Sequence, residues 1–226
     1  MLDITHAESR IAVIRLSRPP VNAINLELLA GLTEALEDAE SNARGIVLTG
    51  SETVFSAGID LKDIGRYDRD QRLETVRRIN ALVIAAIASP LPIVAAITGH
   101  ALGGGLVIPL CCDWRLATTR PCKLGLNEIN AGVPFPAAAI EAVRQTLDPA
   151  VARRLVLSGD PLTPQQALAQ GVVDGLCDDP VAAAIDRCRK LASVPDPARF
   201  KAQWWGPALT SIRAAAADDP MIHSWL

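Results

Sequence analysis

The chain has 226 residues, which is long enough for one domain, with or without a small appendage. Because 50% of the residues are hydrophobic and only 4% are aromatic, we expect a core of aliphatic and small side chains. Its 22 basic and 25 acidic residues give a formal net charge of −3 without any Lys/Arg run, which argues against nucleic acid as a partner. Five cysteines without a CxxC pair favour reduced thiols in a cytoplasmic protein, so we expect neither a disulfide nor a metal site.

The first fifty residues predict strands alternating with a helix. Arg10 to Arg18 alternates apolar and charged residues in its second half, the pattern of a half-buried strand, and Pro19-Pro20 ends it. Asn25 can cap a helix over residues 26–39, whose leucines fall on one stripe. The short apolar run 45–49 predicts a buried strand.

The longest uncharged stretch lies between residues 78 and 113, interrupted at most by one histidine. Two prolines within residues 89–92 and several later glycines break it, so no helix of about 20 residues is left to span a membrane. We expect instead a helix over residues 70–88 and a strand over residues 92–97 that is buried on both faces.

From about residue 136 the chain is predicted to be mainly helical. Four helix starts are marked by a capping residue followed by proline at the first helical position. Strands and helices alternating in the first half, with helices in the second, predict an α/β fold. The four pairs are Asp148-Pro149, Thr163-Pro164, Asp179-Pro180 and Asp196-Pro197.

Glycines are concentrated beside apolar runs in three segments, residues 55–62, 99–105 and 124–128. Glycine lets the backbone turn sharply or approach a ligand closely. The triplet Gly103 to Gly105 precedes a plausible helix, whose free N–H groups suit an oxyanion or a phosphate, but it matches neither a P-loop nor a GxGxxG fingerprint. Taken alone, a tight turn explains the triplet, and a loop with a helix cap explains residues 55–62.

Glu128 lies in an otherwise uncharged stretch from residue 124 to 139 that is rich in glycine and proline. A carboxylate in apolar surroundings has a raised pKa, which brings it toward the range useful for proton transfer near neutrality. An exposed glutamate that caps a helix after Asn127 is the other interpretation of the same residue. The pattern around Glu128 does not decide between them.

Together and in this order, the segments resemble the crotonase (enoyl-CoA hydratase/isomerase) superfamily over roughly residues 10–174. The resemblance implies a crotonase-like β/α superhelix, a ClpP/crotonase-type spiral core, over residues 1–174 with the acyl-CoA site. It also implies a helical C-terminal region over residues 175–226 that covers the site or makes oligomer contacts, and a homotrimer or a hexamer built as a dimer of trimers. The matching motifs are Arg18 to Ala23, Phe55 to Leu61, Pro92 to Ala96, Gly99 to Gly105, Cys112-Asp113, Gly125 to Glu128, Ser158-Gly159 and Ala167 to Asp174.

The resemblance further implies the positions of the site residues. The peptide N–H groups of Ile59 and Gly104 would form the oxyanion hole for an acyl-CoA thioester. CoA enters as part of the substrate, so no separate cofactor is expected. The residues implied to contact substrate or CoA are Ala57, Gly58, Ile59, Asp60, Leu61 and Asn127, with Lys62 near a phosphate.

Two-glutamate hydratases of this superfamily carry a first glutamate shortly after the glycine triplet, where this chain has Val107. The second glutamate matches Glu128. The resemblance is therefore strongest to the Δ3,Δ2-enoyl-CoA isomerases, which shuttle a proton with one glutamate. Hydration or another crotonase reaction on an acyl-CoA is an alternative, and a non-catalytic acyl-CoA-binding or assembly subunit is an alternative of another class.

We expect structural roles for three further residues, Asn22, Asp113 and His100. The C-terminal tryptophans, Trp204-Trp205 and Trp225, lie beyond the matching motifs. They could form a subunit contact, a wall of the acyl pocket or part of the core.

Overall fold

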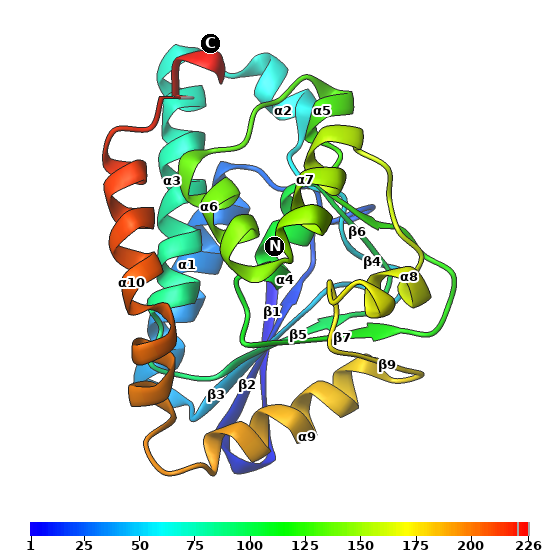
Figure 1. Ribbon diagram of the computed structural model, residues 1–226. Coiled ribbons are helices and arrows are strands. Elements are labelled where there is room, and N and C mark those ends of the chain that lie inside the picture. Colours follow the sequence, from blue (N-terminus) through cyan, green and yellow to red (C-terminus); the bar gives the residue numbers. More distant parts are fainter. Residues whose placement is uncertain (221, 226) are drawn as a thin grey trace.

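The computed structural model describes residues 1–220 and 222–225, and it is built around a six-stranded sheet in the order β1-β2-β3-β5-β7-β9 (Figure 1). β1 runs antiparallel to β2, and every other neighbouring pair in this sheet is parallel. The strands are β1 (Leu2–Ala7), β2 (Ile11–Leu16), β3 (Gly45–Thr49), β5 (Ile93–Ile97), β7 (Trp114–Thr118) and β9 (Gly175–Cys177).

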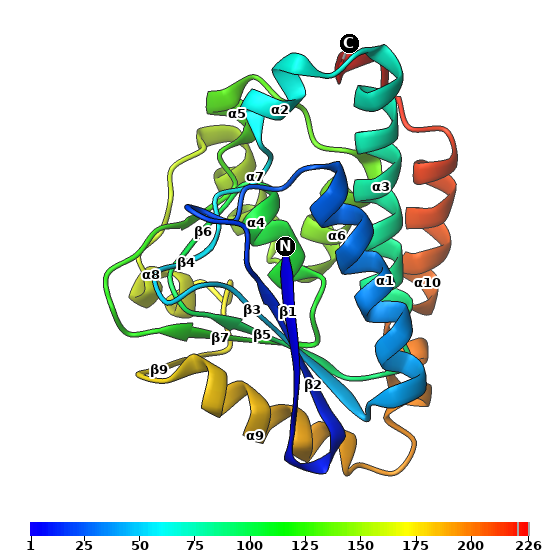
Figure 2. The ribbon, with the colours of Figure 1, turned by 180° about the vertical axis from the view of Figure 1, so that it is seen from behind.

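The central strands are buried on both faces, as the uninterrupted apolar runs predict. In β5, Ile93 and its alternate neighbours face the main core, whereas Val94 and Ala96 face a smaller apolar cluster. Helix α9 (Pro180–Ala192) covers that second face with Ala184 and Cys188 (Figures 1 and 2). The main sheet is therefore the middle layer of the molecule.

A second, smaller sheet brings the three glycine-containing segments together. It contains β4 (Val54–Ser56), β6 (His100–Leu102) and β8 (Leu124–Gly125) in the order β4-β6-β8, and both pairs are parallel. Because the carboxyl ends of parallel strands meet at one edge, the three glycine-containing segments that follow these strands lie together.

Four helices pack against one another on the other side of the molecule, where α3 touches α1, α6 and α10 (Figure 2). They are α1 (Leu26–Asn42), α3 (Arg69–Ala88), α6 (Ala137–Thr146) and α10 (Pro197–Ala217). The short buried helix α4 (Gly104–Leu110) lies between them and the small sheet (Figure 1). The remaining elements are η1 (Glu8–Arg10), α2 (Leu61–Arg66), α5 (Glu128–Ala131), α7 (Pro149–Ser158), α8 (Pro164–Ala169) and η2 (Ile222–Trp225).

The four proline-marked helix starts are confirmed, since α7, α8, α9 and α10 all begin at the predicted proline. In each, the preceding side chain accepts hydrogen bonds from the first-turn N–H groups. Strand β1 was not predicted, because it is an edge strand whose four central residues are exposed and show no apolar pattern. The expected division at residue 174 falls just before β9, which is a strand of the main sheet.

In the described residues, no helix is both long enough and apolar enough to cross a membrane. The apolar stretch between residues 78 and 113 is divided into the end of α3, β5, β6 and α4. Proline and glycine at the junctions produce this division, as the sequence predicts.

Candidate active site

The segments after β4 and β6 are in direct backbone contact. Gly58 has φ +84°, and a Cβ there would lie 2.6 Å from the carbonyl oxygen of Leu102 and 3.3 Å from the backbone nitrogen of Gly104. Gly103, with φ +54° and ψ −131°, donates its N–H to the carbonyl of Gly125 in β8 at 2.8 Å. Glycine at 58 and 103 thus allows three strand ends to meet at one point.

Two backbone N–H groups at this point have no hydrogen-bond acceptor within the described part of the chain, those of Ile59 and Gly104. Ile59 is held between two bonds to Ile24, whose N–H donates to Gly58 and whose carbonyl accepts from Asp60, each at 2.8 Å. Gly104 begins α4, so its N–H has no partner inside the helix. Both residues line the same cavity, where free N–H groups can hold a negatively charged oxygen.

Glu128 is the first residue of α5 and contributes its carboxyl group to this cavity. Its Oε2 is buried and has no hydrogen-bond partner in the described residues. A Cβ on Gly103 would lie 3.4 Å from Oε1, so the carboxyl is adjacent to the glycine turn. Burial raises the pKa of Glu128 to about 7, although a hydrogen bond from its own backbone N–H opposes the shift.

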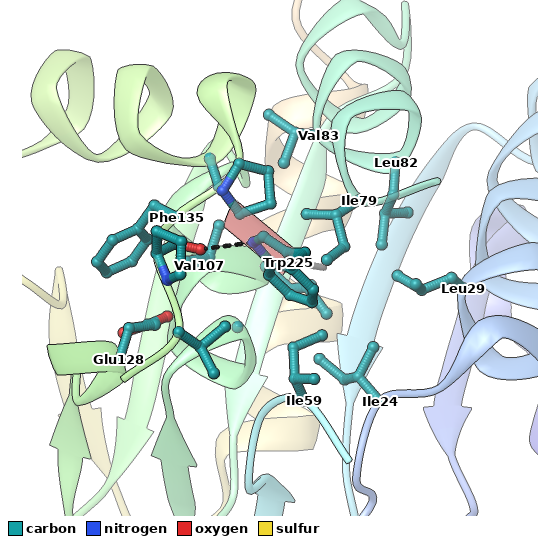
Figure 3. Close-up of a pocket in the computed structure, with 16 residues that line it drawn as sticks. Ile24, Leu29, Ile59, Ile79, Leu82, Val83, Val107, Glu128, Phe135 and Trp225 are labelled. Carbon is teal, nitrogen blue, oxygen red and sulfur yellow. Dashed lines mark hydrogen bonds between the residues drawn. The ribbon is translucent and has the colours of Figure 1, made fainter. Parts of the chain in front are cut away.

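The cavity is otherwise apolar, as Figure 3 shows. Glu128 is the only titratable side chain among the described residues that line it. Val107, on α4, is 4% exposed and faces the same space. For Trp225, which also lines the cavity, a wall of the acyl pocket was one of the three interpretations left open by the sequence. Sequence reasoning did not predict the rest of the apolar wall, which includes Ile24, Leu29, Ile79, Leu82, Val83 and Phe135.

The other residues implied to bind substrate or CoA lie around the contact between Gly58 and Gly103, and they differ in their partners and exposure. The side chain of Asp60 caps α2 and pairs with Arg18 at 2.7 Å. Burial alone would raise the pKa of Asp60, but Arg18 and backbone N–H groups hold it below its ordinary value. Leu61 and Lys62 are exposed beyond the cap, whereas Asn127 Oδ1 lies beside Gly103, 3.3 Å from a Cβ placed there.

The three residues with expected structural roles each form hydrogen bonds to backbone groups of the chain. Asn22 donates from Nδ2 to the carbonyl of Phe55 at 3.0 Å, which ties the first loop to β4. Asp113 accepts from the N–H of Ile93 at 2.7 Å, and His100 Nδ1 accepts from a neighbouring backbone N–H at 3.1 Å. These contacts agree with the structural roles expected for the three residues.

The model of the enoyl-CoA hydratase/isomerase family matches residues 6–204. The chain belongs to this family. A Mycobacterium avium (strain 104) protein named probable enoyl-CoA hydratase EchA17 is 33% identical over 193 residues, which cover 83% of this chain and 74% of that protein.

Solved structures of the enoyl-CoA hydratase/isomerase family are also similar over the whole chain. Human mitochondrial delta3-delta2-enoyl-CoA isomerase superposes with a TM-score of 0.90 at 27% identity, covering 99% of this chain and 90% of that one. A family protein from Pseudomonas syringae gives a TM-score of 0.91 at 26% identity, covering 100% and 98%. The crotonase fold is thereby confirmed, and the chain is an enzyme of a family that acts on acyl-CoA thioesters.

Proposed function

We propose that the protein is a Δ3,Δ2-enoyl-CoA isomerase in which Glu128 alone carries the proton. The observation that carries the proposal is the buried, unpaired Oε2 of Glu128, the only titratable side chain of the described cavity lining. Its pKa of about 7 suits a base near neutral pH, since proton transfer is most efficient when the pKa lies near the working pH.

In the proposed reaction, the thioester oxygen of a 3-enoyl-CoA accepts hydrogen bonds from the N–H groups of Ile59 and Gly104. The Glu128 carboxylate takes a proton from C2, and the electrons of that C–H bond form a dienolate whose negative oxygen these N–H groups hold. The carbonyl then re-forms, a double bond forms between C2 and C3, and the C3–C4 π electrons take the proton from Glu128 at C4. The carboxylate is regenerated and no water is consumed.

The oxyanion-hole donors and the general base are both expected to contribute substantially to the rate. Each oxyanion-hole donor contributes about 3 kcal/mol, and general-base action contributes roughly 100- to 10,000-fold in rate. In the same proposal, CoA lies along the backbone of residues 57–61, with Asn127 beside the reacting group.

Hydration is the competing reaction, and the name of the mycobacterial relative favours it. In the two-carboxylate scheme that the resemblance implies, a second glutamate helps to hold and activate water. Val107, at the corresponding position, is apolar and buried in the cavity wall. An apolar side chain there excludes water from the dienolate and favours isomerisation.

The test is to incubate the wild-type protein separately with a 3-enoyl-CoA and with a 2-enoyl-CoA and to quantify all products by mass-resolved chromatography. We expect isomerisation to exceed formation of 3-hydroxyacyl-CoA by at least about tenfold, a difference of about 1.4 kcal/mol in activation free energy. Hydration faster than isomerisation would refute the proposal in favour of a hydratase. Binding of both thioesters without turnover would favour a non-catalytic subunit.

A further inference from the structure

The acyl cavity already contains a side chain from the C-terminus. Figure 3 shows the indole of Trp225 between the side formed by Glu128 and Val107 and the side formed by Ile24 and Leu29. The side chain is 6% exposed, and its Nε1 donates to the carbonyl of Pro134 at 3.0 Å. Trp225 is therefore both packed and hydrogen-bonded inside the cavity.

The indole leaves little free space. The remaining cavity volume is about 40 Å³, enough for a few water molecules, whereas pockets for small molecules typically measure roughly 300–1,000 Å³. The walls on the far side of the indole are aliphatic side chains of α1 and α3, including Leu29, Ile79 and Leu82. An alkyl chain that extends in this direction meets Trp225.

A second set of contacts lies six residues before Trp225, at Asp219. Asp219, 5% exposed, accepts from Asn80 Nδ2 in α3 and from the N–H of Ala137 at the start of α6, each at 2.8 Å. Asn80 in turn accepts from the N–H of Ala138 at 3.0 Å. Hydrogen bonds to a buried carboxylate are strong, so they hold Asp219 against the two helices beside the cavity.

We propose that Trp225 sets the length of the acyl chain that the enzyme accepts and restricts its substrates to short-chain acyl-CoA thioesters. The inference rests on the proposed function, because it places the thioester carbon between the N–H groups of Ile59 and Gly104 and the Glu128 carboxyl. From that point, a chain that continues past C4 toward α1 and α3 enters the space that the indole now fills. A buried methylene contributes about 0.8 kcal/mol, or about a fourfold gain in affinity, but only where apolar space receives it.

Binding of saturated, unreactive acyl-CoA thioesters tests this inference. Titration calorimetry would compare butanoyl-, octanoyl- and dodecanoyl-CoA on the wild type and on Trp225→Ala. We expect the wild type to bind octanoyl-CoA more weakly than butanoyl-CoA, and the variant to bind octanoyl-CoA at least about tenfold more tightly than the wild type does. Butanoyl-CoA binds both proteins about equally, which also shows that the variant is folded.

Three further variants test whether the size of the Trp225 side chain, rather than its hydrogen bond, determines the chain-length profile. Trp225→Phe keeps most of the bulk but loses the N–H bond to Pro134, so it retains the wild-type chain-length profile. Trp225→Leu keeps an apolar side chain of smaller size and shows an intermediate gain. Trp204→Ala is the matched control, because Trp204 is 76% exposed on α10 and does not line the cavity, and its profile matches the wild type.

Two results would overturn the inference. One is a wild-type affinity that already rises stepwise to dodecanoyl-CoA, as it would if the chain left through the open groove beside Ile129, Ile140 and Val156 on the other side of Glu128. The other is an identical profile in the wild type and Trp225→Ala. Because these ligands do not react, both results are distinguishable from failure of the isomerase proposal, which the assay of 3-enoyl-CoA turnover detects separately.

Discussion

Replacing Glu128 with glutamine is expected to lower kcat for conversion of a 3-enoyl-CoA to a 2-enoyl-CoA by roughly 100- to 10,000-fold. The amide has nearly the shape of the carboxyl but cannot take the C2 proton. The N–H groups of Ile59 and Gly104 remain in place, so KM is expected to change much less than kcat. Steady-state assays of purified Glu128→Gln and wild-type protein measure both constants, and a variant with more than about a tenth of wild-type kcat would contradict the assignment.

The pH dependence of stability shows whether the same variant is folded and whether Glu128 is buried as described. The folded-state pKa lies above the ordinary value of 4.5, so the folded protein binds this proton more tightly than the unfolded chain does. The contribution of Glu128 to wild-type stability is therefore greatest below pH 4.5 and is lost as the pH rises to about 7. Glutamine does not titrate, so Glu128→Gln should gain about 3 kcal/mol relative to wild type between pH 4 and pH 8 in denaturant unfolding. A constant difference over this range would contradict the raised pKa.

Replacing Gly58 with alanine is expected to lower kcat/KM by roughly 100- to 1,000-fold, the cost of an oxyanion-hole donor. Alanine is strained at φ +84°, and its Cβ would lie 2.6 Å from the Leu102 carbonyl and 3.3 Å from the Gly104 nitrogen. The resulting shift displaces the N–H groups on both sides of the proposed oxyanion hole without touching Glu128. The isomerase assay, with rates normalised to the folded fraction, measures the effect.

Gly65→Ala is the matched control for this substitution. Gly65 lies in α2, close in sequence to Gly58, and a Cβ there meets no atom within 4 Å. Alanine is favoured over glycine in a helix by about 1 kcal/mol, so this variant should keep full activity and gain slightly in stability. Equal activity in Gly58→Ala and Gly65→Ala would contradict the oxyanion hole at Ile59 and Gly104.

Helix starts and buried strands could be predicted because their signals are local. A capping aspartate followed by proline fixes the backbone within two residues, as at Asp148-Pro149, and α7 begins there. The apolar run of β5 predicts burial on both faces of the strand, and in the structure its residues are divided between two apolar clusters. Strand β1 carries no such signal, because pairing with β2 in the folded sheet, rather than its own burial, makes it a strand.

The candidate site could be predicted only in part. Local sequence left Glu128 open between a helix cap and a buried base, and the fold supplies the apolar surroundings that leave its Oε2 unpaired. The sequence predicts a helix over residues 70–88, but nothing in it distinguishes Ile79 and Leu82, which face the cavity, from residues that pack against neighbouring helices. Trp225 reaches the cavity through contacts between segments distant in sequence, which a local pattern cannot encode.

In the proposed reaction, one buried carboxyl carries a proton from C2 to C4. Its most direct test is to give the wild-type enzyme a 3-enoyl-CoA deuterated at C2 in ordinary water and to locate the deuterium in the product by NMR. Because Glu128 Oε2 is shielded from solvent, we expect a measurable share of the label at C4 of the 2-enoyl-CoA and none transferred by Glu128→Gln. A product without deuterium at C4, or 3-hydroxyacyl-CoA as the main product, would contradict the single-carboxyl shuttle.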